Sequence, residues 1–174
     1  MRIKVIGCAC AMLLFALDVA GAADTVPASL APPAGLKRLV DLKADGVQIY
    51  RCRPPKTSAV GAPAAVWDLE APRATLTDAQ GKPAGRHYAG PTWEAPDGSK
   101  ITGEVAVRAA APDPKAIAWL LLKTESAGTP GRFDPVRAVQ RVFTWGGLAP
   151  AGACPHVGDA LEVPYRAVYV FWSQ

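Results

Sequence analysis

The sequence is short of the residues and patterns that mark several common functions. It has four cysteines and two histidines in 174 residues, and the histidines, His87 and His156, lie far apart. A structural zinc site takes four ligands in closely spaced pairs, so we expect no metal site. Charged residues make up 20% of the chain at a net charge of +4, without a run of one sign. Because nucleic-acid binding needs a concentrated positive surface, we expect no nucleic-acid partner.

The sequence also lacks the local motifs of cofactor binding and the periodicity of long helices. It has no glycine-rich phosphate loop, nucleotide fingerprint or calcium loop, so we expect no bound cofactor. What it has in quantity is glycine and proline, with 16 and 17 residues. These residues favour many turns between short strands. Half of the residues are apolar, which is enough to build a real hydrophobic core.

The longest apolar run lies at the amino terminus. Arg2 and Lys4 precede an apolar run over residues 5–17, and the small residues 20–22 follow it. This three-part order is typical of a secretory signal peptide, and we expect cleavage after Ala22 or one residue later. The run is shorter than the ~20 residues that a membrane helix needs, so no membrane span is expected after cleavage.

The predicted organisation follows from this cleavage site. Residues 1–22 form the signal peptide, residues 23–35 an extended leader rich in alanine and proline, and residues 36–174 a single domain. The mature protein is then periplasmic or extracellular. It retains two cysteines, Cys52 and Cys154. In an oxidising compartment two thiols most simply pair, so we expect a disulfide between them.

The domain reads as a series of short strands separated by turn residues. Turn signals at Asp45-Gly46, at residues 78–81 and at residues 96–98 predict three hairpins. In residues 100–109, Ile101 and Val107 are expected on one face of a half-buried strand, together with Gly103 and Val105. The predicted strands cover residues 36–43, 47–52, 65–69, 74–77, 82–88, 92–95, 100–109, 117–122, 136–144 and 163–172.

These ten short segments correspond to a domain of about nine strands and predict an all-β fold, a single antiparallel sandwich or barrel. Residues 117–122 are nearly all apolar, so both faces of that strand should be covered. Residues 163–172 are apolar or aromatic on both faces and should form a central strand.

Residues 87–100 hold the densest cluster of polar and aromatic side chains. Aromatic faces beside polar groups are typical of small-ligand and carbohydrate sites. The alternatives are aromatic residues that belong to the core, a hydrolytic triad of His87, Asp97 and Ser99, and an acid/base pair of Glu94 with Asp97. Turn chemistry explains Asp97 and Ser99 without catalysis. The candidate binding surface consists of His87, Tyr88, Trp93, Glu94, Asp97 and Lys100.

Residues 87–100 and 47–52 also resemble a known family. Together with residues 67–72, 118–122 and 163–169, they resemble domain-of-unknown-function family 3455, which contains exported bacterial and fungal proteins. The resemblance implies the fold and the compartment, and it implies no activity. We therefore expect a non-catalytic binding or envelope-associated protein, whose partner is a small molecule or a carbohydrate. The alternative is a hydrolase or another enzyme that acts at residues 87–100.

Overall fold

The structure is a computed structural model that describes residues 25–57, 61 and 63–174. The predicted signal peptide, residues 1–22, lies outside the described residues. No helix in the described part of the chain is long and apolar enough to cross a membrane.

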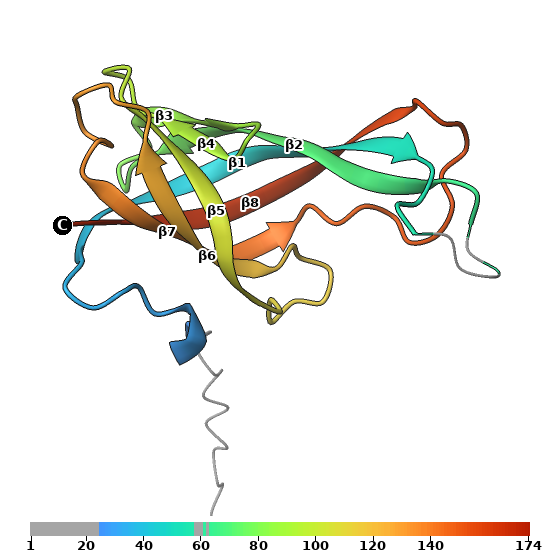
Figure 1. The fold of residues 1–174 in the computed structure, drawn as a ribbon, viewed down its shortest axis with the longest axis horizontal. Helices are drawn as coiled ribbons and strands as arrows, with labels where there is room; N and C mark the ends of the chain where they lie inside the picture. Colours follow the sequence, from blue (N-terminus) through green and yellow to red (C-terminus); the bar gives the residue numbers. More distant parts are fainter. Residues whose placement is uncertain (1–24, 58–60, 62) are drawn as a thin grey trace, which may run out of the picture.

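The protein is all-β, as the sequence predicts. The sequence leaves sandwich and barrel open, and the structure is a closed barrel. Each strand pairs antiparallel with the next one along the chain, and β8 pairs with β1 to close the sheet (Figure 1). A short 3-10 helix, η1 (Ala28–Leu30), precedes the barrel. The strands are β1 (Lys37–Arg53), β2 (Val66–Thr77), β3 (Pro83–Tyr88), β4 (Thr92–Glu94), β5 (Lys100–Ala109), β6 (Trp119–Ser126), β7 (Val136–Gly146) and β8 (Ala160–Ser173).

Two of the three predicted hairpins are confirmed. β2 and β3 are joined through residues 78–82, where the Asp78 carboxylate accepts hydrogen bonds from the backbone N–H groups of Gln80 and Lys82. β4 and β5 are joined through residues 95–99, where Gly98 has a φ of 85°. A positive φ favours glycine, so the turn residues indicated both connections correctly.

The hairpin predicted at Asp45-Gly46 is wrong, because β1 continues straight through these residues. Gly46 pairs with Ala74 of β2 on one side and with Tyr165 of β8 on the other. A Cβ atom on Gly46 would lie 2.1 Å from the backbone oxygen of Arg73. The glycine is therefore required for the close approach of neighbouring strands and makes no turn. Likewise, the two strands predicted over residues 65–77 are the single strand β2.

The facing predicted for β5 is correct in its first half and wrong in its second. Val105 pairs with the inward-facing Leu122, and Val107 pairs with the outward-facing Leu121. Ala106 is the extra residue between these pairs, a β-bulge that shifts the alternation by one position. Val107 therefore points out of the barrel, and Arg108 turns toward the interior beside Leu120.

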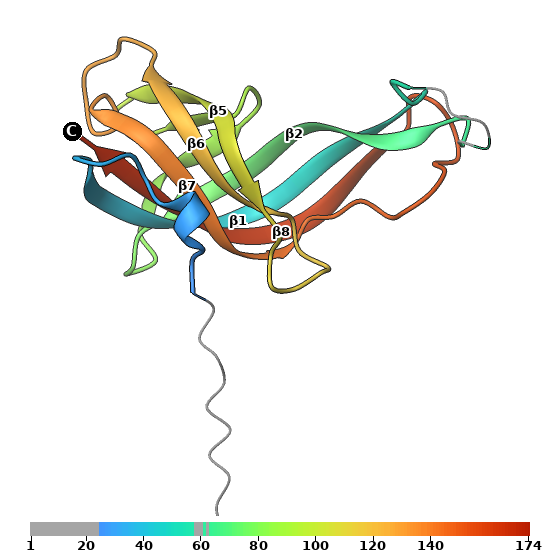
Figure 2. The ribbon, with the colours of Figure 1, turned by 60° about the horizontal axis from the view of Figure 1, so that its bottom comes forward.

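Strand β6 is covered on both faces, as its apolar sequence predicts. Leu120 and Leu122 belong to the core inside the barrel. Trp119 and Leu121 face outward into a second cluster, where the fully buried Leu30 of η1 covers them. The side-chain amide of Gln140 donates a hydrogen bond to the Leu30 carbonyl at 2.6 Å, and Trp172 Nε1 donates one to Gln140 Oε1. The segment before β1 thus packs on the outer face of the barrel (Figure 2).

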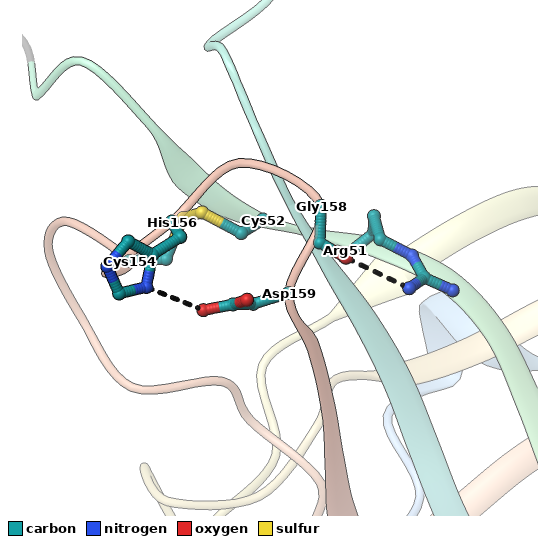
Figure 3. Close-up of a disulfide and its surroundings, with 6 residues drawn as sticks. All are labelled: Arg51, Cys52, Cys154, His156, Gly158 and Asp159. Carbon is teal, nitrogen blue, oxygen red and sulfur yellow. Dashed lines mark hydrogen bonds and ion pairs between the residues drawn. A yellow bond between two sulfur atoms is a disulfide. The ribbon is translucent and has the colours of Figure 1, made fainter.

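Strands β1, β2 and β8 extend beyond the other strands as an arm, which Figure 2 shows clearly. The predicted disulfide between Cys52 and Cys154 is confirmed and lies near the tip of this arm, with its Cα atoms 5.8 Å apart (Figure 3). It ties the end of β1 to the 147–159 loop between β7 and β8. Arg51 Nη1 donates to the Gly158 carbonyl, and the backbone N–H of Cys52 donates to the Asp159 carbonyl, so the loop is bonded along β1.

Candidate functional site

A cavity of about 490 Å³ lies inside the barrel on the side where the arm begins. Most of its wall comes from residues of all eight strands, and the 147–159 loop adds Leu148. A volume of this size is typical of small-molecule sites. The lining residues are Gln48, Tyr50, Leu69, Glu70, Ala71, Pro72, His87, Gly90, Pro91, Trp93, Val105, Arg108, Ile117, Ala118, Leu120, Leu122, Arg141, Leu148 and Tyr169.

Three aromatic rings pack together in the wall of the cavity. His87 and Trp93 are directly paired residues on β3 and β4, and their rings stack at 4.6 Å between centroids with 15° between planes. The Tyr169 ring from β8 meets both edge-on, at 4.9 Å from His87 and 5.4 Å from Trp93. Gly103 of β5 leaves room for the indole, since a Cβ atom there would lie 2.8 Å from the Trp93 ring. The cluster fixes the ring of His87.

His87 is a neutral imidazole with a fixed proton. Its side chain is 2% exposed, and burial lowers its pKa from 6.5 to about 3, an effect that the hydrogen bond to the Thr92 carbonyl opposes. Nδ1 lies 2.8 Å from that carbonyl oxygen, which can only accept, so Nδ1 carries the proton. Nε2 is then a free acceptor, and no hydrogen bond reaches it from the described residues.

Two further polar groups of the cavity wall are hydrogen-bond donors without a partner. Gln48 is 1% exposed and Trp93 is 0% exposed. Neither Gln48 Nε2 nor Trp93 Nε1 has an acceptor within the described residues. An unpaired buried donor costs about 1–3 kcal/mol, so native proteins rarely keep one without a reason. Each donor atom has less than 1 Å² of accessible surface, so it lies behind the surface of the cavity wall, as Trp119 Nε1 and Thr124 Oγ1 do elsewhere in the described chain.

Arg141 places a positive charge inside the barrel. It lies on β7 opposite Leu120, and its Nε and Nη2 atoms donate to the Ala118 carbonyl at 3.1 and 2.9 Å. Burial raises the pKa of Tyr169, and the Arg141 charge opposes this rise because the guanidinium is close to the phenol. The Tyr169 hydroxyl is also 3.4 Å from the Tyr165 hydroxyl. Arg141 and Tyr169 belong to the polar part of the cavity wall.

The mouth of the cavity carries exposed apolar side chains. Leu69, Val105 and Leu148 line it and are 49%, 43% and 44% exposed. The Tyr50 hydroxyl donates a 2.6 Å hydrogen bond to the Gly147 carbonyl, which holds the start of the 147–159 loop against β1. An apolar rim around a polar-ended cavity suits a ligand with a large apolar part.

The six residues of the predicted binding surface do not lie on one side of the sheet. His87 and Trp93 face the interior. Tyr88, Glu94 and Lys100 are on the outer surface, where the Tyr88 hydroxyl donates to Glu94 Oε2 at 2.8 Å and Lys100 lies 3.6 Å from the same carboxylate. The guanidinium of Arg86 also pairs with Glu94. These hydrogen bonds and ion pairs lower the pKa of Glu94.

Asp97, the sixth residue, supports a loop connection. Its carboxylate accepts hydrogen bonds from Ser99 Oγ at 2.6 Å and from the backbone N–H of Arg132, and these bonds lower its pKa to about 2. Ser99 Oγ in turn accepts a hydrogen bond from the backbone N–H of Phe133. Within the described chain, His87 is bonded to neither Asp97 nor Ser99, so the geometry of a catalytic triad is not present. Nor do any three side chains among His, Cys, Asp and Glu in the described residues gather to hold a metal ion.

Sequence reasoning missed most of the polar cavity residues. Gln48, Arg108, Arg141 and Tyr169 were not among the predicted site residues. One signal could have found two of them: Gln48 lies between two apolar residues in Val47-Gln48-Ile49, and Arg141 lies beside Gln140 between two valines in Val139-Gln140-Arg141-Val142. Arg108 gave no such signal, since the bulge at Ala106 decides where it points.

A comparison with protein-family models places the chain. The model described as "Protein of unknown function (DUF3455)" matches residues 32–173. The chain belongs to this family. The match begins just after η1 and covers the whole barrel. It agrees with the resemblance of residues 47–52 and 87–100. Comparison with curated proteins and with solved structures gave no match.

Proposed function

We propose that this DUF3455 member is an exported, non-catalytic binding protein that holds a small, largely apolar molecule in its barrel cavity. The observation that carries the proposal is the cavity of about 490 Å³, whose apolar wall opens at the exposed rim of Leu69, Val105 and Leu148. A ligand that enters the cavity can bury its apolar part against this wall. The disulfide between Cys52 and Cys154 supports an oxidising compartment.

A small apolar molecule is favoured over a carbohydrate. A sugar needs hydrogen-bond partners around its whole ring, whereas Leu120, Leu122 and Ile117 offer none. The alternative of a hydrolase has less support, because His87 contacts no hydroxyl or carboxylate that is placed to act with it in the described chain.

The proposal is tested by binding of N-phenyl-1-naphthylamine, a neutral probe that fluoresces in apolar sites. We expect saturable binding to the purified protein and a rise in its melting temperature, because a ligand of the folded state stabilises it by mass action. The Val105→Trp variant should weaken probe binding at least about tenfold, since the larger side chain fills the mouth of the cavity.

Thr102→Trp is the matched control for the mouth variant. Thr102 lies on the same strand and is exposed on the outer surface, away from the cavity wall. The Thr102→Trp variant should bind the probe with an affinity within about twofold of that of the unmodified protein. Equal binding by both variants, or no saturable binding at all, would overturn the proposed cavity site.

A further inference from the structure

The charged groups of the cavity that have no ionic partner are positive. Arg141 lies inside and Arg108 at the mouth, and within the described chain no carboxylate lies within 4.0 Å of either guanidinium. The acidic side chain of the wall is Glu70. Its carboxylate is already engaged by Arg51 at 2.9 Å and Arg53 at 2.8 Å, which lowers the pKa of Glu70.

The hydrogen bonds that Arg141 makes do not neutralise its positive charge. The Ala118 carbonyl accepts from Nε and Nη2, and a carbonyl oxygen carries no formal charge. The guanidinium also interacts with the Tyr169 phenol, which carries no formal charge at neutral pH either. A half-buried guanidinium without a counterion is costly, because the cavity around it is less polar than water. A ligand that brings a negative group into the cavity removes this cost.

We propose that the ligand is a carboxylic acid with an apolar body, bound as the carboxylate with Arg141 as its charge partner. This inference rests on the proposed function of the cavity. Planar guanidinium and carboxylate groups form paired hydrogen bonds, and the geometry favours Arg over other cations for this task.

The apolar body of the acid occupies the rest of the cavity. Leu120, Leu122 and Ile117 form an apolar wall, and the stacked rings of His87 and Trp93 offer a flat surface. His87 stays neutral because burial lowers its pKa to about 3, so Arg141 is the positive charge inside the cavity and Arg108 lies at its exposed mouth. One interior cation suits a monoanion, which is why a carboxylate fits the cavity better than a phosphate dianion.

The test compares matched ligands that differ only in their polar end. Decanoate and decanol, and naphthoate and naphthylmethanol, are titrated against bound N-phenyl-1-naphthylamine, and their dissociation constants are derived from displacement. We expect each carboxylate to bind about 10- to 100-fold more tightly than its alcohol, the value of a charge-assisted hydrogen bond. Arg141→Gln should bring the two dissociation constants together, and because Arg141 also lines the probe site, the acid-to-alcohol ratio is the readout and not the probe affinity.

Two further variants complete the comparison. Arg141→Lys keeps the charge and should retain part of the preference for the acid. Arg166→Gln removes an arginine that lies over the Trp145 ring outside the cavity, and the preference should stay unchanged. The acid-to-alcohol ratio of the unmodified protein decides the question even where Arg141→Gln does not fold.

The outcomes separate this inference from the proposed function. If the probe binds and acid and alcohol displace it equally, the carboxylate assignment is overturned and the cavity remains a binding site. A preference that persists in a folded Arg141→Gln protein also overturns the role of Arg141. If neither the probe nor any ligand binds, both proposals fall.

Discussion

Lowering the pH toward 5 should destabilise the protein through His87. This imidazole is 2% exposed, and burial lowers its pKa from 6.5 to about 3 in the folded protein. In the unfolded chain the ring is solvated and its pKa returns to about 6.5. Between these values the unfolded state binds a proton that the folded state does not bind. Stability is therefore complete above about pH 6.5 and falls as the pH decreases toward 3.

The size of the effect follows from the difference between the pH of the solution and the pKa of His87 in the unfolded chain. At about pH 5 the medium is ~1.5 units below it, and each unit corresponds to about 1.4 kcal/mol, so the loss is about 2 kcal/mol. For a domain of this size, that loss lowers the melting temperature by about 4–8 °C. Asp97 does not contribute in this window. Its pKa is lowered to about 2, so its share of stability is lost only when the pH falls below about 4.

The assay is urea unfolding at a series of pH values from about 7.5 to 5. His87→Phe keeps an aromatic ring that can stack on Trp93 but cannot titrate, so its free energy of unfolding should lose about 2 kcal/mol less over this range than that of the unmodified protein. His156→Gln, at an exposed loop position, serves as the control and should keep the full pH dependence. Parallel pH profiles for His87→Phe and the unmodified protein would refute the buried, neutral histidine.

Three further changes test the frame that holds the cavity. Replacing Cys52 and Cys154 by serine should lower the free energy of unfolding by about 2–5 kcal/mol in urea, because the bridge closes a separation of 102 residues; unchanged stability would contradict its structural role. Gly46→Ala should give little folded protein by circular dichroism, since its Cβ atom would meet the Arg73 carbonyl at 2.1 Å, and a fully stable variant would disprove the tight strand contact. Leu30→Ala should lower the free energy of unfolding by about 2–4 kcal/mol in thermal unfolding. A loss no larger than that caused by an alanine substitution at an exposed position would show that η1 does not pack on the barrel.

The turn chemistry of the sequence predicted those connections where only local forces act. The hairpins around residues 78–82 and 95–99 are set by glycines with positive φ and by aspartate side chains that bond the nearby backbone. Asp45-Gly46 carries the same local signal, but tertiary pairing overrides it. β1 is bonded on both sides over this stretch, and the missing side chain of Gly46 serves strand contact instead.

The candidate site was predicted in part, for a reason that lies in strand alternation. His87 and Trp93 reach the cavity, whereas Tyr88 and Glu94, one position away on the same strands, lie on the outer surface. A cluster of residues that is contiguous in sequence is necessarily divided between the two faces of a sheet. The residues that complete the cavity come from strands far away in the sequence, and no local pattern in residues 87–100 could indicate them.

The interior of the barrel divides into a filled end and a hollow end, and the lengths of the strands explain the division. At the filled end Phe133, from the loop after β6, stacks on Phe171 at 4.7 Å between centroids, and apolar side chains close the core. At the hollow end β4 has three residues, while β1, β2 and β8 continue into the arm without strands of β4 or β5 opposite them (Figure 1). Inward-facing positions there border the cavity, and they carry Gln48 and Arg141 outside the apolar core. Local rules are commonly broken in this way where a protein binds something. The polar residues inside the barrel are therefore grouped beside the cavity, where they interrupt the apolar core least.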